Sequence, residues 1–157
     1  MKLPPIEHTT FVIERELPGS LRKAFLFWAD PELKERWTDC HSDWTVLDKK
    51  FDFRVGGTEA KRWRTPEGSI LTFNAFYLDI VAEQRIIYAY EMTFKGERIS
   101  ASLATVELSP NASGTWMKFT EQVVFLAGGG MRDQRIAGTG EGFDRLVEVV
   151  SEEPAAT

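Results

Sequence analysis

The sequence predicts an α+β domain in which a curved antiparallel sheet of about six to seven strands wraps around one long C-terminal helix. Apolar and polar residues alternate with a period of two through most of residues 51–126, and turn residues interrupt this alternation repeatedly. A long helical pattern follows only at residues 136–150. One helix must then bury one face of a large sheet, and a curved sheet can do so while leaving an apolar cavity.

The first elements are a strand and two short helices. Residues 11–17 alternate, with Phe11 and Ile13 on one face, and Pro18-Gly19 ends the strand. Ser20 is a suitable N-cap for a helix over Leu21–Trp28. Asp30-Pro31 combines an N-cap with proline at the first helical position, which predicts a second short helix through about residue 37.

The strands that follow are long enough to pair as direct antiparallel hairpins. Gly56-Gly57, Pro66-Glu67-Gly68, Lys95-Gly96-Glu97 and Pro110–Gly114 mark turns between them. Strands are expected at Phe51–Val55, Glu59–Arg64, Ser69–Val81, Gln84–Phe94, Arg98–Leu108 and Thr115–Leu126.

The C-terminal helix carries an apolar face that three glycines interrupt. That face consists of Ile136, Phe143, Leu146, Val147 and Val150. Gly138, Gly140 and Gly142 each cost about 1 kcal/mol relative to alanine inside a helix, so they need a reason. Close packing against a strand or a loosened first turn is favoured over a moving lid above a cavity. Residues 6–150 are expected to form one domain, and the polar residues 151–157 a flexible tail.

Composition excludes several classes of protein. The chain of 157 residues has a formal net charge of −5, which argues against nucleic-acid binding. Five Trp, three Tyr and eleven Phe contrast with two His and one Cys. That contrast excludes an internal disulfide and a cysteine-rich zinc site, and no metal or other cofactor is expected. The sequence shows neither a signal peptide nor an apolar run of membrane-spanning length, so a cytoplasmic protein is expected.

Short motifs occur in a characteristic order from about Thr10 to Val150. They are Ala24-Phe25, Trp28, Pro31-Glu32-Leu33, Trp37, Asp52–Gly57, Glu67-Gly68, Ala101–Val106, Gly114-Thr115, Thr120–Gln122, and Gly142-Phe143 with Leu146. In this order the chain resembles the helix-grip fold of the START and birch-pollen-allergen superfamily. Within it, the chain is most similar to the activator of Hsp90 ATPase homologues, a branch with many bacterial polyketide-cyclase-like proteins. The resemblance implies the fold but no single function, because the family includes ligand carriers, cyclases and co-chaperone domains.

Glu121 is the most informative single residue. The period of two places this carboxylate on the same face as Phe119 and Val123, where a charge is costly unless paired or protonated. One hypothesis makes it a cavity carboxylate that acts as a general base or ligand anchor. The alternatives are a buried partner for an arginine or backbone amide, or a strand end open to water. Arg54 is a candidate counter-charge, although its phase favours an ion pair with Asp52 instead.

Several aromatic residues are predicted to face the same interior. Ile86, Tyr88, Tyr90, Met92 and Phe94 alternate with Arg85, Ala89, Glu91 and Thr93. Tyr88 and Tyr90 would therefore place phenols in an apolar space, as ligand contacts, acid/base groups or ordinary core residues. Trp37 is predicted to gate the cavity or plug it, and Trp63 lies opposite in phase to Arg62. The candidate ligand-binding residues are Trp37, Trp63, Tyr88, Tyr90, Met92, Met117, Phe119, Glu121 and Phe143. Cys40 and His41 are neighbours, but nothing indicates a catalytic pair.

The sequence leads to three hypotheses of function. The preferred one is binding of a small hydrophobic or aromatic molecule in a central cavity. The second is a cyclase-like or hydrolase-like enzyme with Glu121 as base and Tyr88 or Tyr90 as acid. The third is a chaperone-interacting module, which needs an exposed apolar or charged patch. Whether the chain is an enzyme, and whether it is a monomer or a homodimer, stays open at this point.

Overall fold

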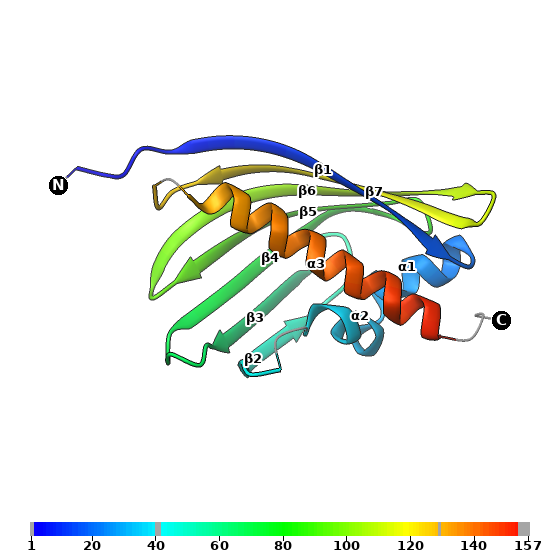
Figure 1. The fold of residues 1–157 in the computed structure, drawn as a ribbon, viewed down its shortest axis with the longest axis horizontal. Coiled ribbons are helices and arrows are strands. Elements are labelled where there is room, and N and C mark those ends of the chain that lie inside the picture. The colour runs from blue at the N-terminus through cyan, green and yellow to red at the C-terminus, as the bar shows by residue number, and fades with distance from the viewer. Residues whose placement is uncertain (1, 40–41, 129, 154–157) are drawn as a thin grey trace.

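A computed structural model describes residues 2–39, 42–128 and 130–153, and within them it contains seven strands and three helices. All seven strands form one antiparallel sheet in the order β1-β7-β6-β5-β4-β3-β2 (Figure 1). The strands are β1 Glu7–Pro18, β2 Thr45–Phe51, β3 Thr58–Arg64, β4 Ile70–Val81, β5 Arg85–Phe94, β6 Glu97–Asn111 and β7 Gly114–Phe125. The helices are α1 Leu21–Ala29, α2 Pro31–Thr38 and α3 Met131–Glu152.

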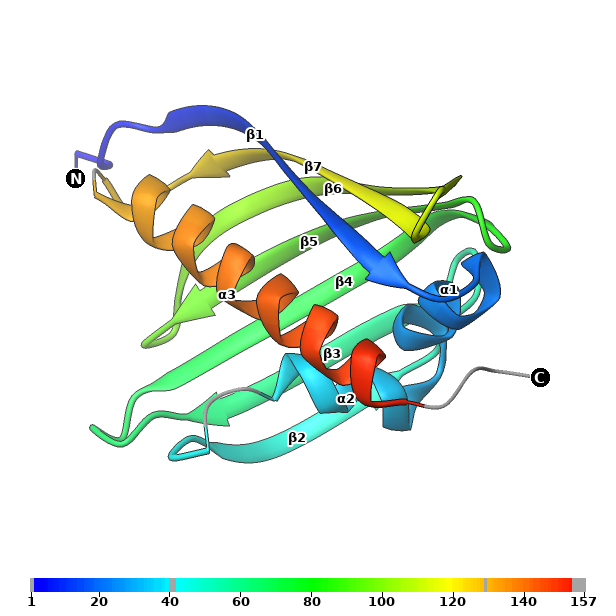
Figure 2. The ribbon, with the colours of Figure 1, turned by 45° about the vertical axis from the view of Figure 1, so that its right-hand side comes forward.

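The sheet is strongly curved, and α3 crosses its concave side (Figures 1 and 2). Helices α1 and α2 lie at the end of the sheet where α3 finishes. The predicted α+β class, the wrap of the sheet around the C-terminal helix and the two short helices after the first strand are therefore confirmed. Alternate residues of the central strands point into this concave side and form the core.

Both short helices begin where their capping residues predict. The Ser20 hydroxyl accepts a hydrogen bond of 3.1 Å from the Lys23 amide at the start of α1. Asp30 accepts hydrogen bonds from the amides of Glu32 and Leu33, and Pro31 follows at the first position of α2. These caps fix the direction of α2, which packs against α3.

The strand predicted at residues 51–55 is wrong. Strand β2 lies earlier and ends at Phe51, and residues 52–57 form an irregular connection. The Arg54 amide donates to the Asp52 carbonyl, and Gly56 has φ +83°. A Cβ on Gly57 would lie 2.1 Å from the Asp52 carbonyl oxygen, so this tight connection requires glycine.

The C-terminal helix is longer than the sequence pattern indicates at both ends. It includes Ser151 and Glu152, the first residues of the predicted tail. The Glu153 carbonyl then accepts a hydrogen bond of 2.7 Å from Lys23, and its carboxylate pairs with Arg36. The chain is therefore attached to α1 and α2 through residue 153, and residues 154–157 lie outside the described residues.

Candidate ligand-binding cavity

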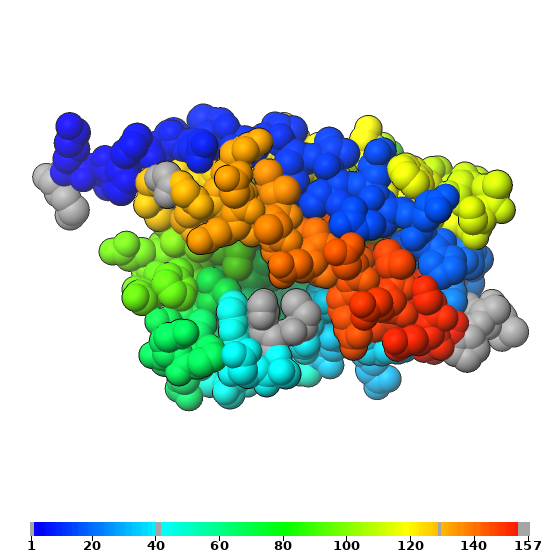
Figure 3. Space-filling model, in the orientation of Figure 1, coloured from blue at the N-terminus to red at the C-terminus, as the bar shows by residue number. Residues whose placement is uncertain are grey.

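An aromatic cavity of about 220 Å³ lies between α3 and the concave side of the sheet. A larger cavity of about 620 Å³ adjoins it, and the two share six lining residues, among them Tyr90 and Gly138. The surface is hollowed beside the first turns of α3 (Figure 3), where Met131 and Gln134 line the larger cavity. We call these two spaces the inner and the outer cavity. The aromatic residues around the inner cavity are Trp28, Trp37, Trp63, Phe73, Tyr88, Tyr90, Phe119 and Phe143.

The predicted site residues largely meet around these spaces. Seven of them line the inner cavity, namely Trp37, Trp63, Tyr88, Tyr90, Phe119, Glu121 and Phe143. Met92 lines the outer cavity. Met117 is different: it is fully buried in the packed core and lies outside the lining of both cavities. Trp37 is fixed in the wall, because its indole donates a hydrogen bond of 2.8 Å to the Phe27 carbonyl.

Strand register explains why these side chains converge. Glu121, Ala104, Tyr88 and Tyr77 occupy paired positions across β7, β6, β5 and β4, so they point to the same side. The small side chain of Ala104 stands between Glu121 and Tyr88 in this row. The next inward row brings Tyr90 opposite Ser102. Glu121 can therefore reach both of these residues along the diagonal.

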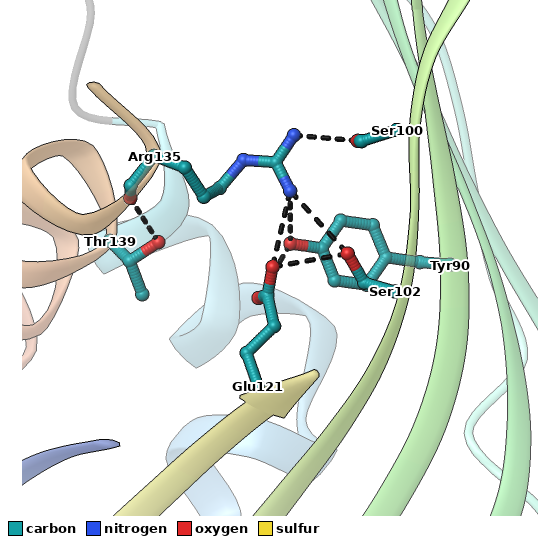
Figure 4. A network of polar contacts seen from close by, with 6 residues as sticks. All are labelled: Tyr90, Ser100, Ser102, Glu121, Arg135 and Thr139. Atoms are coloured by element: carbon teal, nitrogen blue, oxygen red, sulfur yellow. Dashed lines mark hydrogen bonds and ion pairs between the residues drawn. The ribbon is translucent and has the colours of Figure 1, made fainter. Parts of the chain in front are cut away.

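The Glu121 carboxylate is the centre of a buried polar network (Figure 4). Its Oε1 accepts a hydrogen bond of 2.7 Å from the Tyr90 hydroxyl, and its Oε2 accepts one of 3.1 Å from Ser102. Arg135 of α3 forms an ion pair of 3.1 Å with Oε2 and donates a 2.6 Å hydrogen bond to Ser100. The Glu121 and Arg135 side chains are only 1% and 10% exposed. The sequence alternative of a buried partner for an arginine therefore describes Glu121 correctly.

The counter-charge of Glu121 is Arg135 and not the candidate Arg54. Arg54 is 72% exposed and pairs at 2.9 Å with Asp52, as the phase of its strand favoured. Arg135 was missed, although a signal for it exists. It lies eight residues before Phe143, and this spacing puts both residues on the same face of a helix.

A second polar cluster joins α2 to the sheet at another wall of the inner cavity. Lys34 forms an ion pair of 2.6 Å with Glu59, and both side chains contact the Tyr77 hydroxyl, at 3.1 Å and 2.6 Å. Lys61 pairs with Asp39, and burial lowers the pKa of its ammonium group. Lys61 lines the inner cavity, whereas its neighbours Arg62 and Arg64 are exposed.

Two buried aromatic residues of the inner cavity carry a hydrogen-bond donor that no described residue accepts. The Tyr88 side chain makes no hydrogen bond among the described residues, although the residue is only 8% exposed. The Trp28 indole nitrogen is also buried, and no described residue accepts a hydrogen bond from it. An unpaired buried donor costs about 1–3 kcal/mol, and among the described residues only the Trp28 indole nitrogen is such a donor, whereas the Tyr88 hydroxyl is open to the cavity. The carboxylate and ammonium groups of the same wall, in contrast, are all paired.

The explanation of the helix glycines by close packing is wrong for two of the three. Gly138 and Gly142 both line the inner cavity, and a Cβ on either would meet no atom within 4 Å. Gly140 points elsewhere, since its Cβ would lie 3.6 Å from the Arg15 guanidinium on β1. The structure shows no displacement of α3, so the alternative of a moving lid stays untested.

The described residues contain neither a metal-binding cluster nor a membrane-spanning helix. No group of three or more His, Cys, Asp or Glu side chains in residues 2–39, 42–128 and 130–153 is arranged to hold a metal ion. Cys40 and His41 lie outside the described residues. Within the described chain, no helix has the length and hydropathy needed to cross a membrane.

Comparison with known proteins supports the resemblance found in the sequence. Residues 19–151 match the activator of Hsp90 ATPase homolog 1-like protein family. An uncharacterized protein from Rhizobium leguminosarum is similar at 45% identity and a TM-score of 0.90, over 95% of this chain and 98% of that one. The Mll3558 protein from Rhizobium loti has 36% identity and a TM-score of 0.85, over 92% and 99%.

A more distant structure shows the shared fold alone. The AHSA1-like protein from Aeromonas hydrophila has 20% identity and a TM-score of 0.69, over 92% of this chain and 93% of that one. A search among curated proteins gives no match.

The Glu121–Arg135 pair predicts a large difference between single and double substitutions. Arg135→Met should lower the free energy of unfolding by about 3 kcal/mol, because it leaves a carboxylate buried without its counter-charge. The double variant Glu121→Leu/Arg135→Met should recover most of that loss, since no charge is then buried. Urea unfolding measures both. Arg54→Met, which breaks the exposed pair, is the control and should cost less than about 0.5 kcal/mol. A double variant no more stable than Arg135→Met would contradict the assignment.

The three tyrosines predict loss of stability at high pH. Burial is the main cause that raises the pKa of Tyr77, Tyr88 and Tyr90 above the ordinary value of 10.0. The unfolded chain then releases these protons first, so their stabilising effect is complete below about pH 10 and is lost as the pH rises further. The lowered pKa of Lys61 acts in the opposite sense, but for one group only.

Ultraviolet absorbance of phenolate, followed beside circular dichroism, tests this expectation. The phenolate signal should appear only together with unfolding. Tyrosines that ionise near pH 10 while the circular dichroism stays native would contradict it.

Proposed function

The chain belongs to the activator of Hsp90 ATPase homolog 1-like family, and from this premise we propose that it binds a small apolar or aromatic molecule in the inner cavity. The observation that carries the proposal is open space of about 220 Å³ lined by eight aromatic residues and joined to a larger cavity at the surface. Ligand sites are usually concave and mostly apolar, with a few polar groups that orient the ligand. This cavity has that composition.

The arrangement favours binding over acid–base catalysis. Both oxygens of Glu121 accept hydrogen bonds, and Oε2 is also paired with Arg135. A general base needs an oxygen that can take a proton from the substrate. Taking that proton here would leave the Arg135 guanidinium without its counter-charge in a buried place. Glu121 therefore serves better as part of the cavity wall.

Native mass spectrometry of protein purified gently from its own host tests the proposal directly. We expect a species heavier than the bare chain of 17.9 kDa, and the same sample should give the bare mass after denaturation. The extra mass then identifies the ligand. A bare native mass, together with no thermal stabilisation by any member of a set of neutral aromatic compounds, would contradict the proposal.

A second candidate function is contact with a chaperone, and a surface patch favours it. Phe76 and Leu78 are 59% and 52% exposed, on the side of β4 opposite to the inward Tyr77. Backbone hydrogen bonds of Gly56 and Gly57 with Tyr77 bring exposed Val55 beside them. Grouped exposed apolar side chains mark interaction surfaces more often than scattered ones.

A pull-down with the Hsp90 homologue of the host tests this second function. The wild-type chain should be retained, and Phe76→Asp/Leu78→Asp should reduce retention at least about tenfold, because a buried charge opposes apolar contact. Val12→Asp is the matched control, since Val12 is exposed on edge strand β1, at the far side of the sheet. If the wild-type chain is not retained, or both variants lose retention equally, the patch is not a chaperone site.

A further inference from the structure

Part of the roof of the inner cavity is bare helix backbone. Gly138 and Gly142 are four residues apart on α3, so they lie on the same helix face, and both line the cavity. A Cβ on either would meet open space. Glycine inside a helix lowers stability relative to alanine, and no close contact requires it here. Because these two residues lack side chains, open space remains between α3 and the sheet.

The wall facing this roof contains a hydrogen-bond donor without an acceptor. Tyr90 is occupied, because its hydroxyl donates to Glu121. Tyr88 lines the same cavity, is more than nine-tenths buried and makes no hydrogen bond among the described residues. The pKa of Tyr88 is raised by burial and then by Tyr90, Glu121 and Glu59, all of which line this cavity. Its hydroxyl therefore keeps its proton and lies among the cavity groups.

Among the described residues, the charged side chains that line the cavities are paired within the protein. Glu121 is paired with Arg135, and Glu59 with Lys34. The buried ammonium group of Lys61 is paired with Asp39. A charged ligand would lose its hydration without finding a free counter-charge in this wall. The cavity therefore suits an uncharged molecule.

We propose that the ligand is an uncharged, flat aromatic molecule with a hydrogen-bond acceptor, which lies against α3 at Gly138 and Gly142 and accepts a hydrogen bond from the Tyr88 hydroxyl. This inference rests on the proposed binding function and narrows it to one chemical class. It also assigns the two glycines and Tyr88 as residues that determine specificity. The aromatic rings of Trp37, Phe119 and Phe143 supply flat surfaces for such a molecule.

Three naphthalene probes separate the parts of this proposal. They are 2-acetylnaphthalene, which is neutral with an acceptor, 2-isopropylnaphthalene, which lacks the acceptor, and 2-naphthoate, which is anionic. Calorimetric titration should show that the ketone binds about tenfold more tightly than the hydrocarbon, the effect of about one buried hydrogen bond. The anion should bind more weakly than the ketone. Tighter binding of the anion, or equal binding of ketone and hydrocarbon, would overturn the proposal.

Substitutions then locate the ligand. Tyr88→Phe should weaken binding of the ketone about tenfold and leave binding of the hydrocarbon unchanged. Gly138→Ala/Gly142→Ala should weaken binding of both neutral probes, because the added methyl groups occupy the room beneath α3. Gly140→Ala, on another face of the same helix, should leave both affinities unchanged. Equal effects of Gly140→Ala and the double variant, or no effect of Tyr88→Phe on ketone binding, would overturn the assignment.

Folding is checked separately by thermal unfolding of each variant. Alanine at the glycine positions meets open space, so the double variant should melt no lower than the wild type.

The outcomes also distinguish a wrong ligand class from a failure of the binding function. If host-purified protein carries a molecule but no probe binds, the ligand class inferred here is wrong and the binding function stands. If host-purified protein carries nothing and no neutral aromatic compound binds, the binding function itself fails.

Discussion

The buried ion pair between Glu121 and Arg135 is the contact on which the arrangement of helix and sheet depends. Glu121 projects from β7 into the concave side, where an ionised carboxylate is costly unless it is paired. Arg135 must therefore reach it, and this requirement fixes where α3 crosses the sheet. Gly138 and Gly142 follow about one and two helical turns later, so the same contact places both above the aromatic floor. The pair thus determines the position of the cavity roof as well as the local charge balance.

Open space persists beside this contact because polar clusters hold the surrounding elements apart. Protein interiors normally fill to crystal-like density, and an interior made only of aromatic rings would be expected to collapse. Here Arg135 ties α3 to the sheet near the outer cavity, while Lys34 and Glu59 tie α2 to β3. Collapse would have to break hydrogen-bonded ion pairs that are already out of water, which is strongly unfavourable. Ion pairs therefore hold the elements around the cavity in place, and aromatic side chains line it.

The sequence predicts much of this through periodicity and capping, and the rest depends on tertiary contacts. Alternation places Glu121 on the inward face of its strand. Strand alternation does not apply to Arg135, which lies on α3. Its spacing from Phe143 places it on the inward face of the helix, but a charged residue in the first turns of a helix is usually solvated. Phe51 and Phe53 alternate like a strand, but the backbone contacts of Gly57 form a tight connection there. The sequence also does not distinguish a helix glycine that lines a cavity from one that packs against a strand.

The hydrogen bonds divide the cavity groups into those that support it and those that can recognise a ligand. Glu121 and Glu59 are bonded to donors from other elements, so a ligand that engaged either carboxylate would compete with contacts that maintain the fold. Tyr88 is different, because a ligand can accept its hydrogen bond without displacing any contact among the described residues. Such a bond adds to the affinity without breaking a hydrogen bond within the protein. Recognition is therefore expected at Tyr88, whose hydroxyl donates to no described residue although its ring packs in the core.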